Sequence, residues 1–234
     1  MSEVQVVDPA GKSLCRAGGI CAIGFGIAYV VIIALYVPLG ARPSDAGAWL
    51  AYLARNTPTW WAILGLSVLT DFLLVPVALA LYLALKGINK SVMLVAIAFM
   101  GLFVVLDLAL TWTNYAYAIV LSGDYAAATS DAQRAALIAA AHYPAALLES
   151  PLLFVYNSLT LAVGILLTGL VMRRGIFNKR TAYLGVITGV LGVVAVTSSF
   201  FASSVSTMVI ILTSVLTTAW VPLVGYRLYR LDRQ

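Results

Sequence analysis

Charged residues are scarce in this 234-residue chain, and their scarcity excludes a soluble domain. Only 10% of the residues are charged, whereas 62% are hydrophobic, and the mean hydropathy is +1.01. A soluble domain needs more polar surface than such a composition can supply. The composition therefore predicts an integral membrane protein.

The chain also has few of the residues that hold metals or form disulfides, with one histidine and two cysteines. Zinc sites draw on histidine, cysteine and carboxylate ligands, and neither an HExxH nor a GxSxG motif is present. Cys15 and Cys21 are six residues apart, a spacing that places them on different sides of a helix. We interpret both as packing residues and expect no metal and no other cofactor.

Six long apolar runs are present, and each is long enough to cross the hydrocarbon core of a bilayer as a helix. The predicted spans cover residues 17–39, 58–85, 91–121, 144–172, 181–202 and 207–229. Unbroken apolar runs without alternation exclude a membrane β-barrel. The sequence therefore predicts an all-α polytopic membrane protein, one domain over residues 1–234, with six transmembrane helices in one bundle.

The longest predicted connection, between the third and fourth spans, carries the start signal of a further helix. Ser130 followed by Gln133 matches a capping box, and Asp131 suits the first turn. The alanine-rich sequence that follows favours helix, and Pro144 is expected to break or bend it at the fourth span. We expect a short interfacial helix on the extracytoplasmic surface.

Basic residues predict the orientation of the chain. Eleven of the 14 Lys and Arg residues fall on one side of the predicted spans: Lys12, Arg16, Lys86, Lys90, Arg173, Arg174, Lys179, Arg180, Arg227, Arg230 and Arg233. Because Lys and Arg are retained on the cytoplasmic side, both termini are expected in the cytoplasm and the protein in the plasma (inner) membrane. The excess positive charge favours membrane lipids as partners, whereas nucleic acid is not expected to bind.

Small residues gather on the first and fifth predicted spans. The glycines concerned are Gly18, Gly19, Gly24 and Gly26 on the first, and Gly185, Gly189 and Gly192 on the fifth. Such faces allow helix backbones to approach closely. We expect them to pack against helices of the same bundle, of a second copy in a homo-oligomer, or of a larger membrane complex.

Three acids interrupt the apolar runs, namely Asp71 in the second span, Asp107 in the third and Glu149 in the fourth. No Lys or Arg is predicted at comparable depth, and a carboxylate in hydrocarbon costs at least ~2.5 kcal/mol. The acids must therefore stay protonated or lie beside a cation. Asn114 shares a predicted helix face with Asp107, and His142 and Tyr156 share one with Glu149. Asn157 directly follows Tyr156.

Two interpretations of these residues remain open. In the first, neutral acids hold helices together through hydrogen bonds worth ~0.6 kcal/mol each. In the second, an outward-facing pocket binds a cationic or amphipathic small molecule, or couples its transport to protons. The predicted lining is Asp71, Asp107, Asn114, His142, Glu149, Tyr156 and Asn157.

Two further functions are weighed against that pocket. One is a non-catalytic structural or accessory subunit of a larger membrane complex. The other is an intramembrane lipid hydrolase whose metal would be held by His142, Glu149, Asp107 and Asp71. An enzyme is not favoured, because no nucleophile is paired with a base.

Short motifs over about residues 16–194 resemble a widespread family of bacterial six-helix membrane proteins known only as a domain of unknown function. The similar features are Arg16 before AGG, Asp71 ahead of VALALYLALKGINK, the LSGDY turn with Gln133, His142 with Glu149, and GIFNK before Leu184 and Gly185. Where that family often has a glycine-rich stretch after the acid of the fourth helix, this chain has Pro151 and Asn157. The resemblance implies a six-helix membrane fold and no particular activity.

Overall fold

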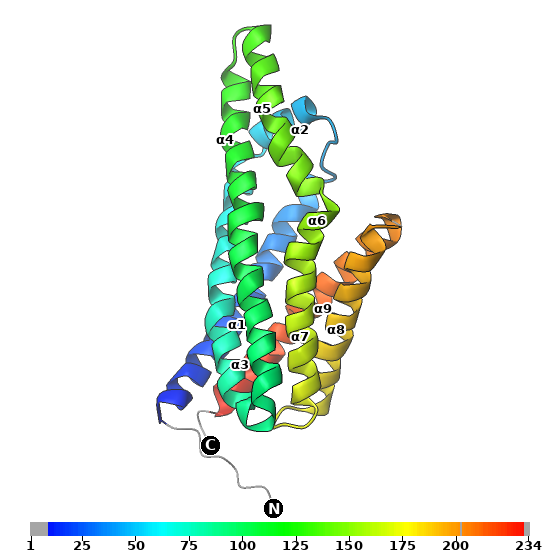
Figure 1. Cartoon of the computed structure of the whole chain (residues 1–234). Helices are drawn as coiled ribbons and strands as arrows, with labels where there is room; N and C mark the ends of the chain where they lie inside the picture. Colours follow the sequence, from blue (N-terminus) through cyan, green and yellow to red (C-terminus); the bar gives the residue numbers. More distant parts are fainter. Residues whose placement is uncertain (1–8, 202, 232–234) are drawn as a thin grey trace, which may run out of the picture.

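The computed structural model describes residues 9–201 and 203–231, and helices account for 91% of these residues (Figure 1). No strand occurs among these described residues. The prediction of an all-α fold is therefore confirmed.

Nine α-helices follow one another in the described residues. They are α1 (Pro9–Tyr36), α2 (Ala46–Arg55), α3 (Thr57–Leu106), α4 (Thr113–Ala127), α5 (Asp131–Glu149), α6 (Pro151–Phe154), α7 (Thr160–Met172), α8 (Lys179–Ser199) and α9 (Ser203–Leu231). A 3-10 turn, η1 (Val37–Leu39), follows α1. Two π-helical segments, η2 (Asp107–Trp112) and η3 (Val155–Leu159), connect α3 to α4 and α6 to α7.

Five helical segments of the described chain are long and apolar enough to cross a membrane: Gly11–Leu39, Thr57–Ala127, Pro151–Met172, Lys179–Ser199 and Met208–Leu231. The second has 71 residues, far more than the ~20 that one crossing needs. Asn89, with φ −154° and ψ 92°, interrupts its helical geometry, and the chain reverses direction there (Figure 1). The Asn89 side chain then accepts a hydrogen bond from the Val92 amide and caps the second arm of this hairpin.

The bundle closes because each long helix packs against two others. α1 lies between α3 and α9, α8 lies between α9 and α7, and α7 returns to α3. Leu81, Ile165 and Trp220 are buried at its centre. By contrast, Ile27 and Phe72 are 63% and 59% exposed, as expected for side chains that face lipid.

The glycine faces that the sequence singled out pack inside this bundle. Gly19 on α1 lies against the backbone of Tyr229 on α9, and Gly189 on α8 lies against the backbone of Leu166 on α7. A β-carbon at Gly189 would lie only 2.5 Å from Leu166 Cβ. These small residues therefore let helices of the same chain approach one another.

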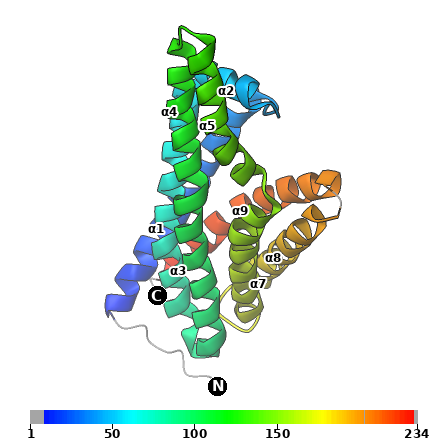
Figure 2. The ribbon, with the colours of Figure 1, turned by 45° about the horizontal axis from the view of Figure 1, so that its top comes forward.

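α4 and α5 form a second hairpin, which projects beyond the bundle with α2 packed against both arms (Figure 2). The predicted capping box at its turn is present. The Gln133 amide donates to Ser130 Oγ at 3.3 Å, and the Ser130 amide donates to Gln133 Oε1 at 3.4 Å. Trp49, Leu50 and Leu53 of α2 are fully buried beneath the hairpin.

The structure differs from the predicted fourth span, residues 144–172. α5 continues through Pro144 to Glu149, and the chain turns extended at Ser150, with φ −66° and ψ 131°. A residue that precedes proline is disfavoured in helical geometry, so Pro151 accounts for the break. The apolar segment that could cross a membrane begins only at Pro151. The predicted end of the fifth span, at residue 202, lies outside the described residues.

Candidate functional site

The two π-helical segments carry the polar residues that meet inside the bundle. η2 begins at Asp107 and ends at Trp112, and η3 contains Asn157. A π-helical turn accommodates one extra residue in a helix, and such turns are frequent at functional sites. Both segments are flanked by regular α-helix, so the irregular backbone is confined to this place.

Asp107 and Asn157 form a direct hydrogen bond, although they are 50 positions apart in the chain. Asn157 Nδ2 donates to Asp107 Oδ1 at 2.6 Å and also to Thr111 Oγ1. The Trp112 indole donates to Asp107 Oδ2 at 3.0 Å. Asp107 is only 7% exposed, and each of its two carboxyl oxygens accepts a bond from a neutral donor.

Asp71 lies beside this group, on α3, and is 3% exposed. Its carboxyl interacts electrostatically with Asp107 and with the Trp112 indole. Among the described residues, Asp71 Oδ2 and Asn157 Oδ1 have no hydrogen-bond partner, although both atoms are buried. Buried polar atoms are nearly always paired, so two bare acceptors on residues that both interact with Asp107 favour a site for a donor or a positive charge.

Two residues at this site escaped the sequence reasoning, namely Trp112 and Tyr29. Trp112 follows Asp107 by five residues, a spacing that an α-helix would place on different faces and that only the π-helical turn brings together. Tyr29, on α1, lies within electrostatic range of both Asp71 and Asp107, and its ring stacks on Phe25. No pattern in the sequence marks Tyr29, because it is one aromatic among many in an apolar span.

Glu149 lies apart from the acid pair. Its side chain is 55% exposed at the end of α5, and Glu149 Oε1 lies 3.4 Å from Arg42 Nη2. The prediction that Glu149 has no basic residue at comparable depth is therefore wrong. The cause is the break at Ser150, which places Glu149 on the projecting hairpin beside the connection that carries Arg42.

The other predicted lining residues lie in different surroundings. His142 is exposed on α5, and Tyr156 is half-buried in η3. Asn114 donates to the Leu110 carbonyl, in the preceding turn of the same helical segment, at 2.6 Å. Within the described ranges, no three His, Cys, Asp or Glu side chains are placed to hold one metal ion. The four ligands that the hydrolase hypothesis requires are thus not brought together.

Aromatic side chains connect the acid pair with the base of the projecting hairpin. The ring of Trp112 lies 5.8 Å from that of Tyr115, which stacks on Trp60 at 5.2 Å. Tyr115 also interacts with Arg42, whose guanidinium lies 4.0 Å above the Trp49 ring. An aromatic wall, formed by Trp112, Tyr115, Trp60 and Trp49, therefore joins the buried carboxyls to Arg42 of the Arg42–Glu149 ion pair through side-chain contacts.

A scan of protein-family models and searches of curated proteins and of solved structures find no match to this chain. The family resemblance noted from the sequence therefore stays a prediction, and the geometry of the site is the basis for inferring a function.

Proposed function

We propose that this chain is a multi-pass plasma-membrane protein with six crossings, whose acid pair, Asp71 and Asp107, binds a cationic small molecule in exchange for protons. The observation that carries the proposal is the pair of bare acceptors, Asp71 Oδ2 and Asn157 Oδ1, inside the bundle. A positive charge or a proton would satisfy both atoms.

The charge balance of the site supports a cation as the ligand. The donors to Asp107 are an amide and an indole, which are neutral. Within the described part of the chain, no Lys or Arg forms an ion pair with either acid, and Arg42 is paired with Glu149 instead. Both carboxyls are buried and interact electrostatically, and two such carboxylates are not both ionised unless a cation lies beside them. Protons and a cationic ligand would therefore compete for the same oxygens.

Binding of a probe cation tests this site. Asp71→Asn is expected to weaken the binding of tetraphenylphosphonium at least tenfold, because the amide keeps the shape of the side chain and removes its charge. Asp71 is the cleaner target, since both oxygens of Asp107 accept hydrogen bonds that an amide at that position would disturb. The measurement is the rise in melting temperature of the purified protein as the probe is added.

Glu149→Gln is the matched control, because this acid lies outside the site and is paired with Arg42. It should leave the thermal shift caused by the probe unchanged. Equal shifts in wild type, Asp71→Asn and Glu149→Gln would instead show that the buried acids only hold helices together.

The six crossings follow if the 71-residue segment enters the membrane as a hairpin turned at Asn89. Its two arms, residues 57–88 and 90–127, are each longer than one crossing requires. Lys86 and Lys90 flank the turn, and basic residues favour the cytoplasmic side. Both termini are proposed to lie on that side as well.

Labelling of single introduced cysteines tests this topology. In a background with Cys15 and Cys21 replaced by alanine, Ala127→Cys should react with a membrane-impermeant maleimide in intact cells, because it ends the arm opposite the Asn89 turn. Lys90→Cys should react only after the membrane is permeabilised. The cysteine-free background is the control, and the reversed pattern would contradict the orientation.

A further inference from the structure

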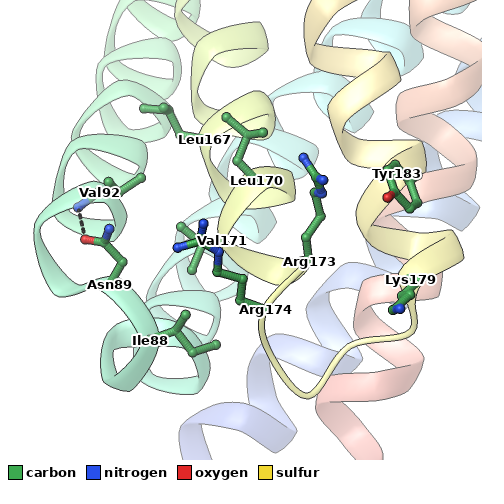
Figure 3. Close-up of a pocket in the computed structure, with 10 residues that line it drawn as sticks. All are labelled: Ile88, Asn89, Val92, Leu167, Leu170, Val171, Arg173, Arg174, Lys179 and Tyr183. Carbon is green, nitrogen blue, oxygen red and sulfur yellow. Dashed lines mark hydrogen bonds between the residues drawn. The ribbon is translucent and has the colours of Figure 1, made fainter.

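A cavity of about 470 Å³ lies among α3, α7 and α8, at the end of the bundle that carries the Asn89 turn (Figure 3). We refer to it as the basic pocket. Its lining residues are Ile88, Asn89, Val92, Leu167, Leu170, Val171, Arg173, Arg174, Lys179 and Tyr183. None of them belongs to the acid pair or to the aromatic wall, so the basic pocket is a separate feature.

The connection between α7 and α8 is held in place beside this pocket. Phe177 is buried in the main core, the same cluster as Leu81 and Trp220. A β-carbon at Gly175 would lie 2.5 Å from Ile88 Cδ1. Arg227 of α9 donates to the Ile176 carbonyl at 3.1 Å. Contacts with α3, α9 and the main core thus hold this short connection in place, so the shape of the pocket is determined by the packing of the bundle.

The positive charges of the pocket are not balanced. Arg173, Arg174 and Lys179 form no ion pair with any residue of the described chain. The Arg173 guanidinium lies 5.2 Å from the centre of the Tyr183 ring, which restricts its orientation. Three cationic side chains around one cavity attract an anion, and guanidinium groups suit phosphate oxygens in particular.

The opposite end of the basic pocket is apolar. Leu167 precedes Arg173 by six residues of helix, which corresponds to ~9 Å along the axis. Leu170 and Val171 lie between these levels, and Val92 of α3 faces them across the cavity (Figure 3). Arg173 and Arg174 directly follow the apolar segment Pro151–Met172, and Lys179 is the first residue of the apolar segment Lys179–Ser199. The termini of segments that cross a membrane lie at the level of the lipid headgroups.

We propose that the basic pocket binds one anionic phospholipid, with the phosphate at Arg173, Arg174 and Lys179 and an acyl chain along Leu167 and Leu170. A free phosphate would satisfy the basic end but would leave the apolar end unused. A zwitterionic lipid would bring an ammonium group toward three cations. Basic pockets between membrane helices on the cytoplasmic side are suited to anionic headgroups.

Native mass spectrometry of the purified full chain, titrated with phosphatidylglycerol or phosphatidylcholine of identical acyl chains, tests the proposal. The wild-type protein should bind one molecule of phosphatidylglycerol, with an affinity at least about tenfold higher than its affinity for phosphatidylcholine. The triple variant Arg173→Gln, Arg174→Gln, Lys179→Gln should lose that preference. Inorganic phosphate and glycerol phosphate at ten times the lipid concentration should not displace the lipid.

The matched control replaces three basic residues outside the pocket, Lys12→Gln, Lys86→Gln and Arg230→Gln, and should keep the preference within about twofold. If both triple variants lose the preference for phosphatidylglycerol equally, the preference comes from the overall positive charge and not from the pocket. If phosphate displaces the lipid, the pocket binds a soluble anion. Either result, or equal affinity for the two lipids, overturns the proposal. If the triple pocket variant does not fold, Arg174→Gln alone should weaken the binding of phosphatidylglycerol about fivefold. An unchanged affinity in that variant would also overturn the proposal.

Discussion

Gly189→Ala is expected to lower the melting temperature of the purified protein by about 5 °C or more, a large effect for a single added methyl group. Its β-carbon would lie 2.5 Å from Leu166 Cβ, 2.6 Å from Leu166 Cα and 2.7 Å from Leu166 N. Two of these atoms are backbone, so α7 and α8 must separate to admit the methyl group. Overpacking of this kind costs roughly 1–3 kcal/mol.

Gly65→Ala provides the control, because no atom lies within 4 Å of a β-carbon at that position of α3. Alanine favours helix over glycine by up to about 1 kcal/mol, so this variant should melt at the same temperature or higher. A similar loss in both variants would mean that glycine is needed for some reason other than the contact between α7 and α8.

Asn157→Leu is expected to destabilise the bundle by about 2 kcal/mol. Leucine is similar in size but cannot donate, so Asp107 Oδ1 and Thr111 Oγ1 both lose the bond from Asn157 Nδ2. An acceptor left buried without its partner costs about 1–3 kcal/mol, and the lost bond links η2 to η3 across the interior. Thermal unfolding in a neutral detergent would measure the change.

Asn114→Leu separates this cross-bundle bond from the general effect of removing an amide. Asn114 is half-buried as well, but its side chain bonds to the Leu110 carbonyl in the preceding turn. The expected loss is therefore below about 1 kcal/mol. Equal destabilisation by the two leucine variants would contradict the view that the Asp107–Asn157 pair holds the helices together.

The helical, apolar character of the chain could be predicted from its composition, and the start of α5 could be predicted from Ser130 and Gln133. These signals are local, because a capping box depends on residues three positions apart. The length of α5 could not be predicted in the same way. A break or bend was expected at Pro144, whereas the chain turns at Ser150, ahead of Pro151.

The candidate site was only partly accessible to sequence reasoning. Asp71 and Asp107 stood out because acids are costly in apolar spans. The predicted lining also included Asn157, but it did not separate this residue from His142 and Glu149. Which of the predicted residues meet depends on how α3, η2 and η3 pack, which no local pattern encodes. Glu149 gave the same signal as the two aspartates but was misplaced, since an error of a few residues in a helix boundary moves a side chain from the bundle to its surface.

The π-helical segments also bear on how such a chain can change in length. One residue corresponds to about 100° of an α-helix, but η2 already holds one residue more than an α-helical turn does, so deleting a single position there would restore regular α-helix and leave α4 close to its present rotation. Tyr115 would stay stacked on Trp60, whereas the bond from Trp112 to Asp107 would be lost, because it depends on the π-helical spacing of five residues. A deletion of equal size in the turn between α4 and α5 would leave these contacts untouched. Loss of one residue at η2 would therefore remove the geometry of the acid site while the bundle is kept, whereas the tip of the hairpin can change in length without either effect.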